Sequence, residues 1–177
     1  MFACGASAAT AAEYTRIIPE KSAIKFVYRQ MNVPMEGSFA RYSSQLRFDP
    51  AKPAAATASF QIDLNTIDTG ATDADEEVRG KLWFNTKAFP QASFVSNSVI
   101  ALGGNRFEVR GKLTIKGKTQ DITAPLSFSQ DGPNGLFEAA FSIRRADFAI
   151  GEGAWADFGT VANDVQIKIR LLASTSK

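Results

Sequence analysis

Apolar and polar residues alternate along most of this chain, and that alternation restricts the fold more than any other feature. Between residues 107 and 115, the apolar side chains Phe107, Val109, Leu113 and Ile115 alternate with charged and hydroxyl side chains. The same period of two recurs in six further segments: 24–28, 40–48, 58–64, 122–128, 137–143 and 165–171. Successive side chains of a β-strand point to opposite faces of a sheet, so the pattern predicts antiparallel strands with one buried face.

Short glycine-rich connections separate several of these segments. Turns are predicted at residues 103–105 (GGN), 116–118 (KGK) and 131–135 (DGPNG). Consecutive hairpins form a meander, and closure of a long meander removes its exposed edges. We therefore expect an all-β fold, an eight-stranded antiparallel up-and-down barrel. Such a barrel either fills its interior with side chains or holds one ligand, and composition alone leaves both open.

One stretch breaks the period. Residues 71–82 read ATDADEEVRGKL, with acidic side chains where a helix N-terminus favours negative charge. We expect one short helix here, capped by Thr72 or Asp73. The acidic residues are interpreted as helix-stabilising, because they supply only a fragment of a calcium-binding loop.

The chain contains no histidine, and its one cysteine is Cys4. A Ser-His-Asp or Cys-His triad and the usual zinc sites are therefore excluded. We expect a protein that is not an enzyme and that needs no metal or cofactor. Basic residues are interspersed with acidic ones and the net charge is only +2, which argues against a nucleic-acid surface.

The first twelve residues, MFACGASAATAA, are almost all small. We interpret residues 1–12 as a truncated signal peptide, with residues 9–11 (ATA) as its cleavage site, or as a disordered tail. Lipidation of Cys4 fits the residues before it poorly. No apolar run approaches about 20 residues, so no transmembrane segment is expected. The folded domain is expected to span residues 13–177.

Short motifs follow one another along that domain. They are residues 22–26 (SAIKF), 37–39 (GSF), 67–70 (IDTG), 75–79 (DEEVR), 84 (F), 89–94 (FPQASF), 111–119 (GKLTIKGKT), 145–151 (RADFAIG) and 164–167 (DVQI). In this order and spacing, the chain resembles the YceI-like family of bacterial periplasmic lipocalin-like proteins. The resemblance implies an extended antiparallel barrel that binds long apolar or amphiphilic molecules, typically polyisoprenoids such as quinone-like tails. It also implies export to the periplasm and no established catalytic activity.

The chain departs from the family pattern at one place, and one matching motif needs interpretation. Many family members carry a histidine shortly after the strand that matches residues 24–27, whereas residues 28–34 here read YRQMNVP. A head-group contact by that histidine therefore does not carry over. Arg145 and Asp147 match a family motif that we interpret as structural, holding a strand end by a salt bridge or a turn.

The inward-facing apolar residues are the candidates for lining the bore. On the strands they are Phe26, Tyr28, Phe60, Ile62, Phe94, Leu113, Phe128 and Phe141. At the mouth, in the two irregular segments, they are Trp83, Phe84, Trp155 and Phe158. The hydroxyl of Tyr28 is a candidate contact for a ligand head group. From the residues alone, core packing explains any one of these side chains at least as well, and the resemblance favours a ligand-lined bore.

The leading hypothesis is a periplasmic carrier that sequesters a polyisoprenoid or isoprenoid quinone, its partner being a hydrophobic small molecule. The alternative is a non-catalytic interaction module, without a physiological ligand, that supports a membrane redox or envelope partner. The alternative predicts a bore packed solid with side chains and an exposed apolar patch. A homodimer is compatible with either hypothesis.

Overall fold

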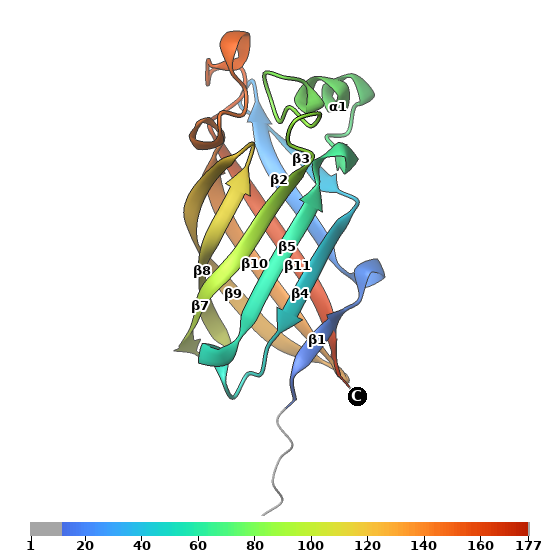
Figure 1. Ribbon diagram of the computed structural model, residues 1–177, viewed down its shortest axis with the longest axis vertical. Helices are drawn as coiled ribbons and strands as arrows, with labels where there is room; N and C mark the ends of the chain where they lie inside the picture. The colour runs from blue at the N-terminus through green and yellow to red at the C-terminus, as the bar shows by residue number, and fades with distance from the viewer. Residues whose placement is uncertain (1–11, 177) are drawn as a thin grey trace, which may run out of the picture.

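The alternating segments form one curved antiparallel sheet in the computed structural model, which describes residues 12–176 (Figure 1). The strands are β1 (Tyr14–Ile17), β2 (Ala23–Gln30), β3 (Val33–Phe39), β4 (Tyr42–Arg47), β5 (Thr57–Asp63), β6 (Ile67–Asp68), β7 (Gln91–Gly103), β8 (Arg106–Ile115), β9 (Lys118–Asp131), β10 (Asn134–Arg144) and β11 (Asp164–Thr175). The helices are α1 (Thr72–Arg79) and the short 3-10 turns η1 (Pro19–Lys21), η2 (Pro53–Ala55), η3 (Leu64–Thr66), η4 (Arg145–Phe148) and η5 (Gly153–Trp155). Cys4 and the predicted cleavage site lie outside the described residues.

The strand order is β4-β5-β7-β8-β9-β10-β11-β2-β3-β6, with β1 paired to β11. The all-β class with one helix is confirmed, and so are the three predicted turns. The strand count is eleven rather than eight. The difference arises because three long strands are each interrupted: η1 separates β1 from β2, residues 40–41 separate β3 from β4, and η3 separates β5 from β6.

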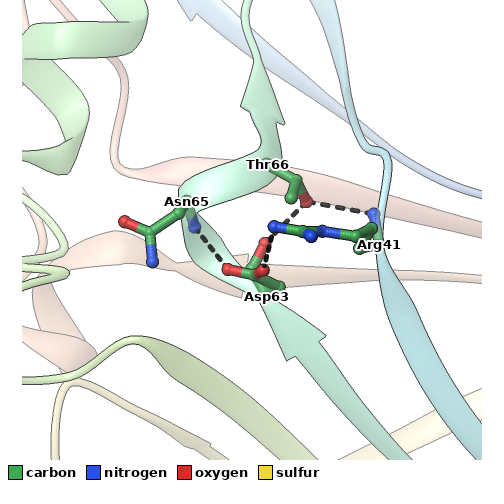
Figure 2. Close-up of polar contacts among 4 residues, drawn as sticks. All are labelled: Arg41, Asp63, Asn65 and Thr66. Carbon is green, nitrogen blue, oxygen red and sulfur yellow. Dashed lines mark hydrogen bonds and ion pairs between the residues drawn. The ribbon is translucent and has the colours of Figure 1, made fainter.

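The barrel closes where the β3–β4 stretch runs beside the β5–β6 stretch (Figure 2). The backbone N–H of Arg41 donates to Thr66 Oγ1 (3.0 Å), and the backbone N–H of Asp63 donates to the carbonyl of Arg41 (3.0 Å). The guanidinium of Arg41 also pairs with the Asp63 carboxylate at 2.9 Å, and that carboxylate accepts from the backbone N–H of Asn65. These contacts carry hydrogen bonding across the interruption from the β4–β5 pair to the β3–β6 pair.

Helix α1 lies over one end of the barrel, beside the loop of residues 145–163 (top of Figure 1). We call this end the mouth. The helix is shorter than the predicted 71–82 segment, and the predicted cap is wrong. Ala71 occupies the cap position without a side-chain hydrogen bond. Asp75 instead accepts from the backbone N–H and the hydroxyl of Thr69 (2.7 and 2.6 Å), which ties the helix to the end of β6.

Aromatic rings fill the opposite end of the barrel. Tyr14 on β1 exchanges two backbone hydrogen bonds with Phe48, at 2.8 and 3.0 Å. Around this pair pack Phe107, Phe128 and Phe137, with ring centroids of neighbouring pairs 5.0–5.9 Å apart. We call these five residues the plug. Edge-to-face and tilted ring packing of this kind fills space densely, so the plug closes the barrel at this end.

Candidate functional site

A cavity of about 450 Å³ occupies the barrel between the plug and the mouth. All strands from β2 to β11 contribute inward-facing residues to its wall, and nearly all of these side chains are apolar. The size falls within the range of small-molecule binding sites, roughly 300–1,000 Å³. The alternation that shields one face of each strand from solvent therefore also builds a continuous apolar wall around this space.

The burial of inward-facing side chains differs along the barrel axis. In the plug, Phe128 and Phe137 are buried. In the middle, Phe94, Phe141 and Ile167 face inward but are only half-buried, and all three line the cavity. The remaining exposed surface of these side chains borders the cavity. In a bore packed solid with side chains, that surface would be covered.

Ten of the twelve predicted lining residues border the cavity. They are Phe26, Tyr28, Phe60, Ile62, Trp83, Phe84, Phe94, Leu113, Phe141 and Trp155. Phe128 and Phe158 do not. Phe128 faces inward as predicted but belongs to the plug, with its ring 5.2 Å from that of Phe137. Phe158 is 48% exposed and stacks over the guanidinium of Arg145 at 5.1 Å, outside the cavity wall.

Two tryptophans connect the elements that border the mouth. The rings of Trp83 and Trp155 lie 5.4 Å apart, and Trp155 Nε1 donates to Glu77 Oε1 on α1 at 2.8 Å. This bond links the 145–163 loop to the helix. Trp83 is 7% exposed, and its Nε1 has no hydrogen-bond partner among the described residues. A buried indole N–H without an acceptor is unusual, because the lost hydrogen bond to water is not replaced.

The side chain of Arg145 fixes the conformation of the 145–163 loop through hydrogen bonds to its backbone. It is 2% exposed, and burial lowers the pKa of its guanidinium. Its three nitrogens donate, at 2.7–3.2 Å, to five backbone carbonyls: those of Ile150, Gly151, Trp155, Val161 and Ala162. The interpretation of Arg145 as structural agrees with this geometry. The predicted ion pair, however, joins Asp147 to the neighbouring Arg144, at 3.0 Å.

Tyr28 lies on the inner face of β2 near the mouth. Its hydroxyl donates a long hydrogen bond (3.4 Å) to the carbonyl of Thr69. Burial raises the pKa of Tyr28, and the negative charge of Asp75 raises it further. The phenol therefore stays neutral at physiological pH and can also accept a hydrogen bond.

Sequence reasoning missed the four lining residues on α1: Asp73, Ala74, Glu77 and Val78. Asp73 and Glu77 were interpreted only as helix-stabilising. Their spacing of four residues places them on one helix face, together with Ala74 and Val78, which also line the cavity. That i, i+4 spacing is the signal that could have identified a helix face turned toward the bore.

Among the described residues, three charged side chains border the cavity: Asp73, Glu77 and Arg145. Within residues 12–176, no three histidine, cysteine or carboxylate side chains cluster as metal ligands would. In that same part of the chain, no helix has the length and apolar character to cross a membrane.

Comparison with known proteins gives consistent matches. The YceI-like domain model matches residues 16–173. A UPF0312 protein of Yersinia pestis is 32% identical over 137 residues, covering 74% of this chain and 69% of the relative. The crystal structure of BcnA from Burkholderia cenocepacia is 43% identical with a TM-score of 0.87, covering 89% of this chain and 99% of BcnA.

A more distant structure shares the fold. It is a polyisoprenoid binding domain from Saccharophagus degradans, implicated in plant cell wall breakdown. It is 17% identical with a TM-score of 0.70, covering 94% of this chain and 99% of that domain.

Proposed function

This chain belongs to the YceI-like domain family, and from that premise we propose that it is a non-catalytic carrier that sequesters a long apolar or amphiphilic molecule inside its barrel. The apolar cavity of about 450 Å³ inside the barrel carries the proposal. The ligand class is a polyisoprenoid or an isoprenoid quinone. The name of the Saccharophagus relative, a polyisoprenoid binding domain, supports that class.

Burial of the chain alone can supply useful affinity. A chain of about 15 carbons buried at roughly 0.8 kcal/mol per CH₂ gains about 12 kcal/mol. Loss of translational and rotational freedom offsets about 4 kcal/mol or more of this gain. The net gain is therefore at most about 8 kcal/mol, which corresponds to micromolar binding. No catalytic group is required for this task, which suits a chain without histidine.

The polar atoms near the mouth suit a ligand with one polar end. The phenol of Tyr28 belongs to a residue that lines the cavity. A hydroxyl group on the ligand can donate to the phenol oxygen, and a carbonyl oxygen can accept from the phenol in place of its long bond to the Thr69 carbonyl (3.4 Å). The two plug residues that line the cavity, Phe48 and Phe137, carry no polar side-chain atom, so we orient the ligand with its head toward α1 and its tail toward the plug.

The alternative, an interaction module without a ligand, predicts a solidly packed bore. The cavity of about 450 Å³ inside the barrel contradicts that expectation. Export to the periplasm remains part of the proposal, and it is supported by the small residues at positions 1–12 that resemble the end of a signal peptide.

Native mass spectrometry of the protein purified from a bacterial host tests the proposal, followed by organic extraction and identification of the released lipid. We expect a stoichiometric long-chain species, and an empty preparation should take up a ubiquinone analogue. A protein that arrives empty and also fails to take up ubiquinone analogues would contradict the carrier function and favour the interaction module.

A further inference from the structure

The β2–β3 hairpin carries exposed apolar side chains at the mouth end of the barrel. Met31 and Val33 at its tip are 69% and 55% exposed, and Met35 is 37% exposed. Phe158, which is 48% exposed, lies close to them, because the backbone N–H of Met31 donates to the carbonyl of Thr160 at 2.8 Å. We call Met31, Val33, Met35 and Phe158 the rim. No rim residue lines the cavity, so the enclosure of a ligand does not explain this exposure.

The hairpin extends past the rest of the sheet. β6 ends at Asp68, opposite Ser38 on β3, so residues 33–37 of β3 have only β2 as a strand partner within the described part of the chain. Figure 1 shows the upper end of β2 between α1 and the 145–163 loop. The rim therefore projects from the barrel wall at the mouth.

Val33 and Met35 continue the inner face of the barrel beyond the cavity. Cross-strand partners share a face of the sheet, and the register pairs Met35 with Tyr28 and Val33 with Gln30. Tyr28 and Gln30 both line the cavity, and Gln30 is exposed. The cavity therefore meets solvent beside Gln30, and the inner face of the hairpin runs on from that opening to the rim.

The backbone at the tip of the hairpin is unfavourable for one of the residues that it carries. Met31 has φ +50° and Asn32 has φ +65°, so both lie in the left-handed region. Asparagine adopts this conformation more readily than most residues, whereas methionine is disfavoured there. Because Met31 is 69% exposed, packing within the protein compensates little of this cost. The fold therefore does not explain a methionine at this position, whereas contact with a partner does.

The chemistry around the rim fits a lipid bilayer as that partner. Residues 30–35 (QMNVPM) carry no charge, and the exposed Arg29 precedes them, its guanidinium donating to a carbonyl of the turn at 3.3 Å. The acids nearest to the rim in sequence are engaged: Glu36 pairs with Lys25 at 3.0 Å, and Asp157 accepts from a backbone N–H at 2.9 Å. An apolar tip with a flanking cation matches the bilayer interface, where acyl chains lie below lipid phosphates.

The wider mouth end carries charges of both signs. Asp73, Glu76 and Glu77 are exposed on α1, and Lys81 and Lys87 are exposed in the segment that follows it. Because these charges oppose one another, long-range attraction to anionic lipids is weak, and apolar contact by the rim dominates docking.

We propose that the rim docks on a lipid bilayer, so that a ligand passes between the membrane and the cavity through the opening beside Gln30. This surface goes beyond the proposed function, and the transfer that it serves rests on that function. A long apolar chain is strongly disfavoured in water, because every exposed CH₂ group adds to the cost. With the rim in the bilayer, the inner face of the hairpin lets the chain move between two apolar environments.

Transfer of decylubiquinone from the loaded protein to vesicles of phosphatidylethanolamine and phosphatidylglycerol tests this proposal. The two tryptophans of the chain both line the cavity, and a bound quinone quenches their fluorescence, so recovery of the fluorescence reports the departure of the ligand. Transfer by collision with the membrane gives a rate that rises in proportion to the vesicle concentration. Transfer through water gives a rate that does not depend on the vesicle concentration. We expect transfer by collision.

The rim variant Met31→Asn/Val33→Thr removes two apolar side chains and suits the local backbone, since asparagine accepts a left-handed φ and threonine is β-branched. It should transfer the quinone at least about fivefold more slowly than the wild type and float less with the vesicles. Its affinity for decylubiquinone without vesicles should stay within about twofold, because neither residue lines the cavity. The matched control is Val95→Thr/Leu102→Asn, which makes the same kind of change at side chains 57% and 60% exposed on β7. The control should behave like the wild type.

The outcomes separate docking from the carrier function. A transfer rate independent of vesicle concentration, or a rim variant that transfers as fast as the wild type, overturns docking and leaves the carrier function in place. In the second case, loss of a wild-type dimer in the rim variant, measured by analytical ultracentrifugation, would assign the rim to a second copy of the chain.

Two further results concern the ligand itself. A folded rim variant that binds decylubiquinone much more weakly without vesicles overturns docking and assigns the rim to the binding site. If the wild type takes up no decylubiquinone, the carrier function fails, and flotation alone tests the rim. A wild type that does not float with the vesicles, or a rim variant that floats equally well, then overturns docking.

Discussion

Filling the cavity from one wall should separate ligand affinity from stability, and Ala139 on β10 is the position that allows it. Ala139 lines the cavity, and its cross-strand partners Leu126 and Ile169 line it as well. The next residue, Ala140, is exposed on the outer face of the same strand. Ala139→Phe therefore directs a ring into the cavity, and Ala140→Phe directs the same ring into solvent.

The magnitudes follow from the apolar surface involved. The ring at position 139 takes the space of about six ligand carbons, an upper limit near 5 kcal/mol at roughly 0.8 kcal/mol per CH₂. A flexible chain can shift toward the mouth and recover part of this. We expect affinity to fall at least tenfold, or about 1.4 kcal/mol. In the ligand-free protein the ring buries apolar surface in unfilled space, so the free energy of unfolding should rise by about 1 kcal/mol or more.

The assay is a titration with farnesol, paired with urea denaturation of the delipidated proteins. Ala139→Phe should bind more weakly and unfold at higher urea, whereas Ala140→Phe should leave both within about 0.5 kcal/mol of the wild type. Reduced affinity together with reduced stability would mean that the ring disrupts the barrel rather than filling it. Unchanged affinity in a folded Ala139→Phe protein would refute binding in this cavity.

Three further predictions concern stability. Replacing Arg145 with Leu leaves the loop carbonyls without donors and should lower the free energy of unfolding by about 3 kcal/mol or more, measured by urea denaturation. Met31 is 69% exposed with φ +50°, a left-handed conformation that costs about 1–2 kcal/mol; Met31→Asn should raise the thermal midpoint, and a lower midpoint would contradict this strain. Burial, and secondarily Asp75, raise the pKa of Tyr28 above its ordinary value of 10.0. The folded state therefore holds this proton to higher pH than the unfolded state, and its contribution to stability is complete below pH 10 and lost as the pH rises through the folded-state pKa. Tyr28→Phe should lessen the fall in stability above pH 10, seen in urea denaturation at stepped alkaline pH, and an identical fall in both proteins would count against this assignment.

Much of the fold could be predicted because inward and outward residues differ in chemistry along each strand. The places where a strand breaks or shifts its register could not be predicted, and β7 gives an example. Phe94 and Val99 on β7 both line the cavity, although strict alternation would place residues five positions apart on opposite faces. A register shift between Ser96 and Ser98 reverses the facing of the strand at that point. Residues 96–98 read SNS, and no apolar side chain among them marks the change.

The candidate site was predictable on the strands and less so at its ends. From the sequence alone, the acidic residues Asp73 and Glu77 can be explained in two ways: they stabilise the helix, or they lie on a helix face turned toward a ligand. Only the packing of α1 over the mouth decides that both residues border the cavity. The prediction that Phe158 lines the mouth was wrong for a related reason. Arg145 binds the backbone carbonyls of Trp155 and Val161, on either side of Phe158, and in the resulting loop conformation the ring lies outside the cavity wall.

Phe128 and Phe141 show why an inward-facing ring does not by itself predict a binding site. Both lie on the inner face of a strand, and alternation treats them alike. Phe128 is 9% exposed because Tyr14 and Phe48, from segments remote in sequence, pack against its ring. Within the described part of the chain, no aromatic ring pairs with that of Phe141, which is half-buried and lines the cavity. Tyr14 comes from β1, a strand of four residues that is too short to show clear alternation. The lower limit of the cavity is therefore set by contacts between distant segments: the five rings of the plug fill one end, whereas rings such as Phe60 and Phe141 lie along the wall of the remaining space.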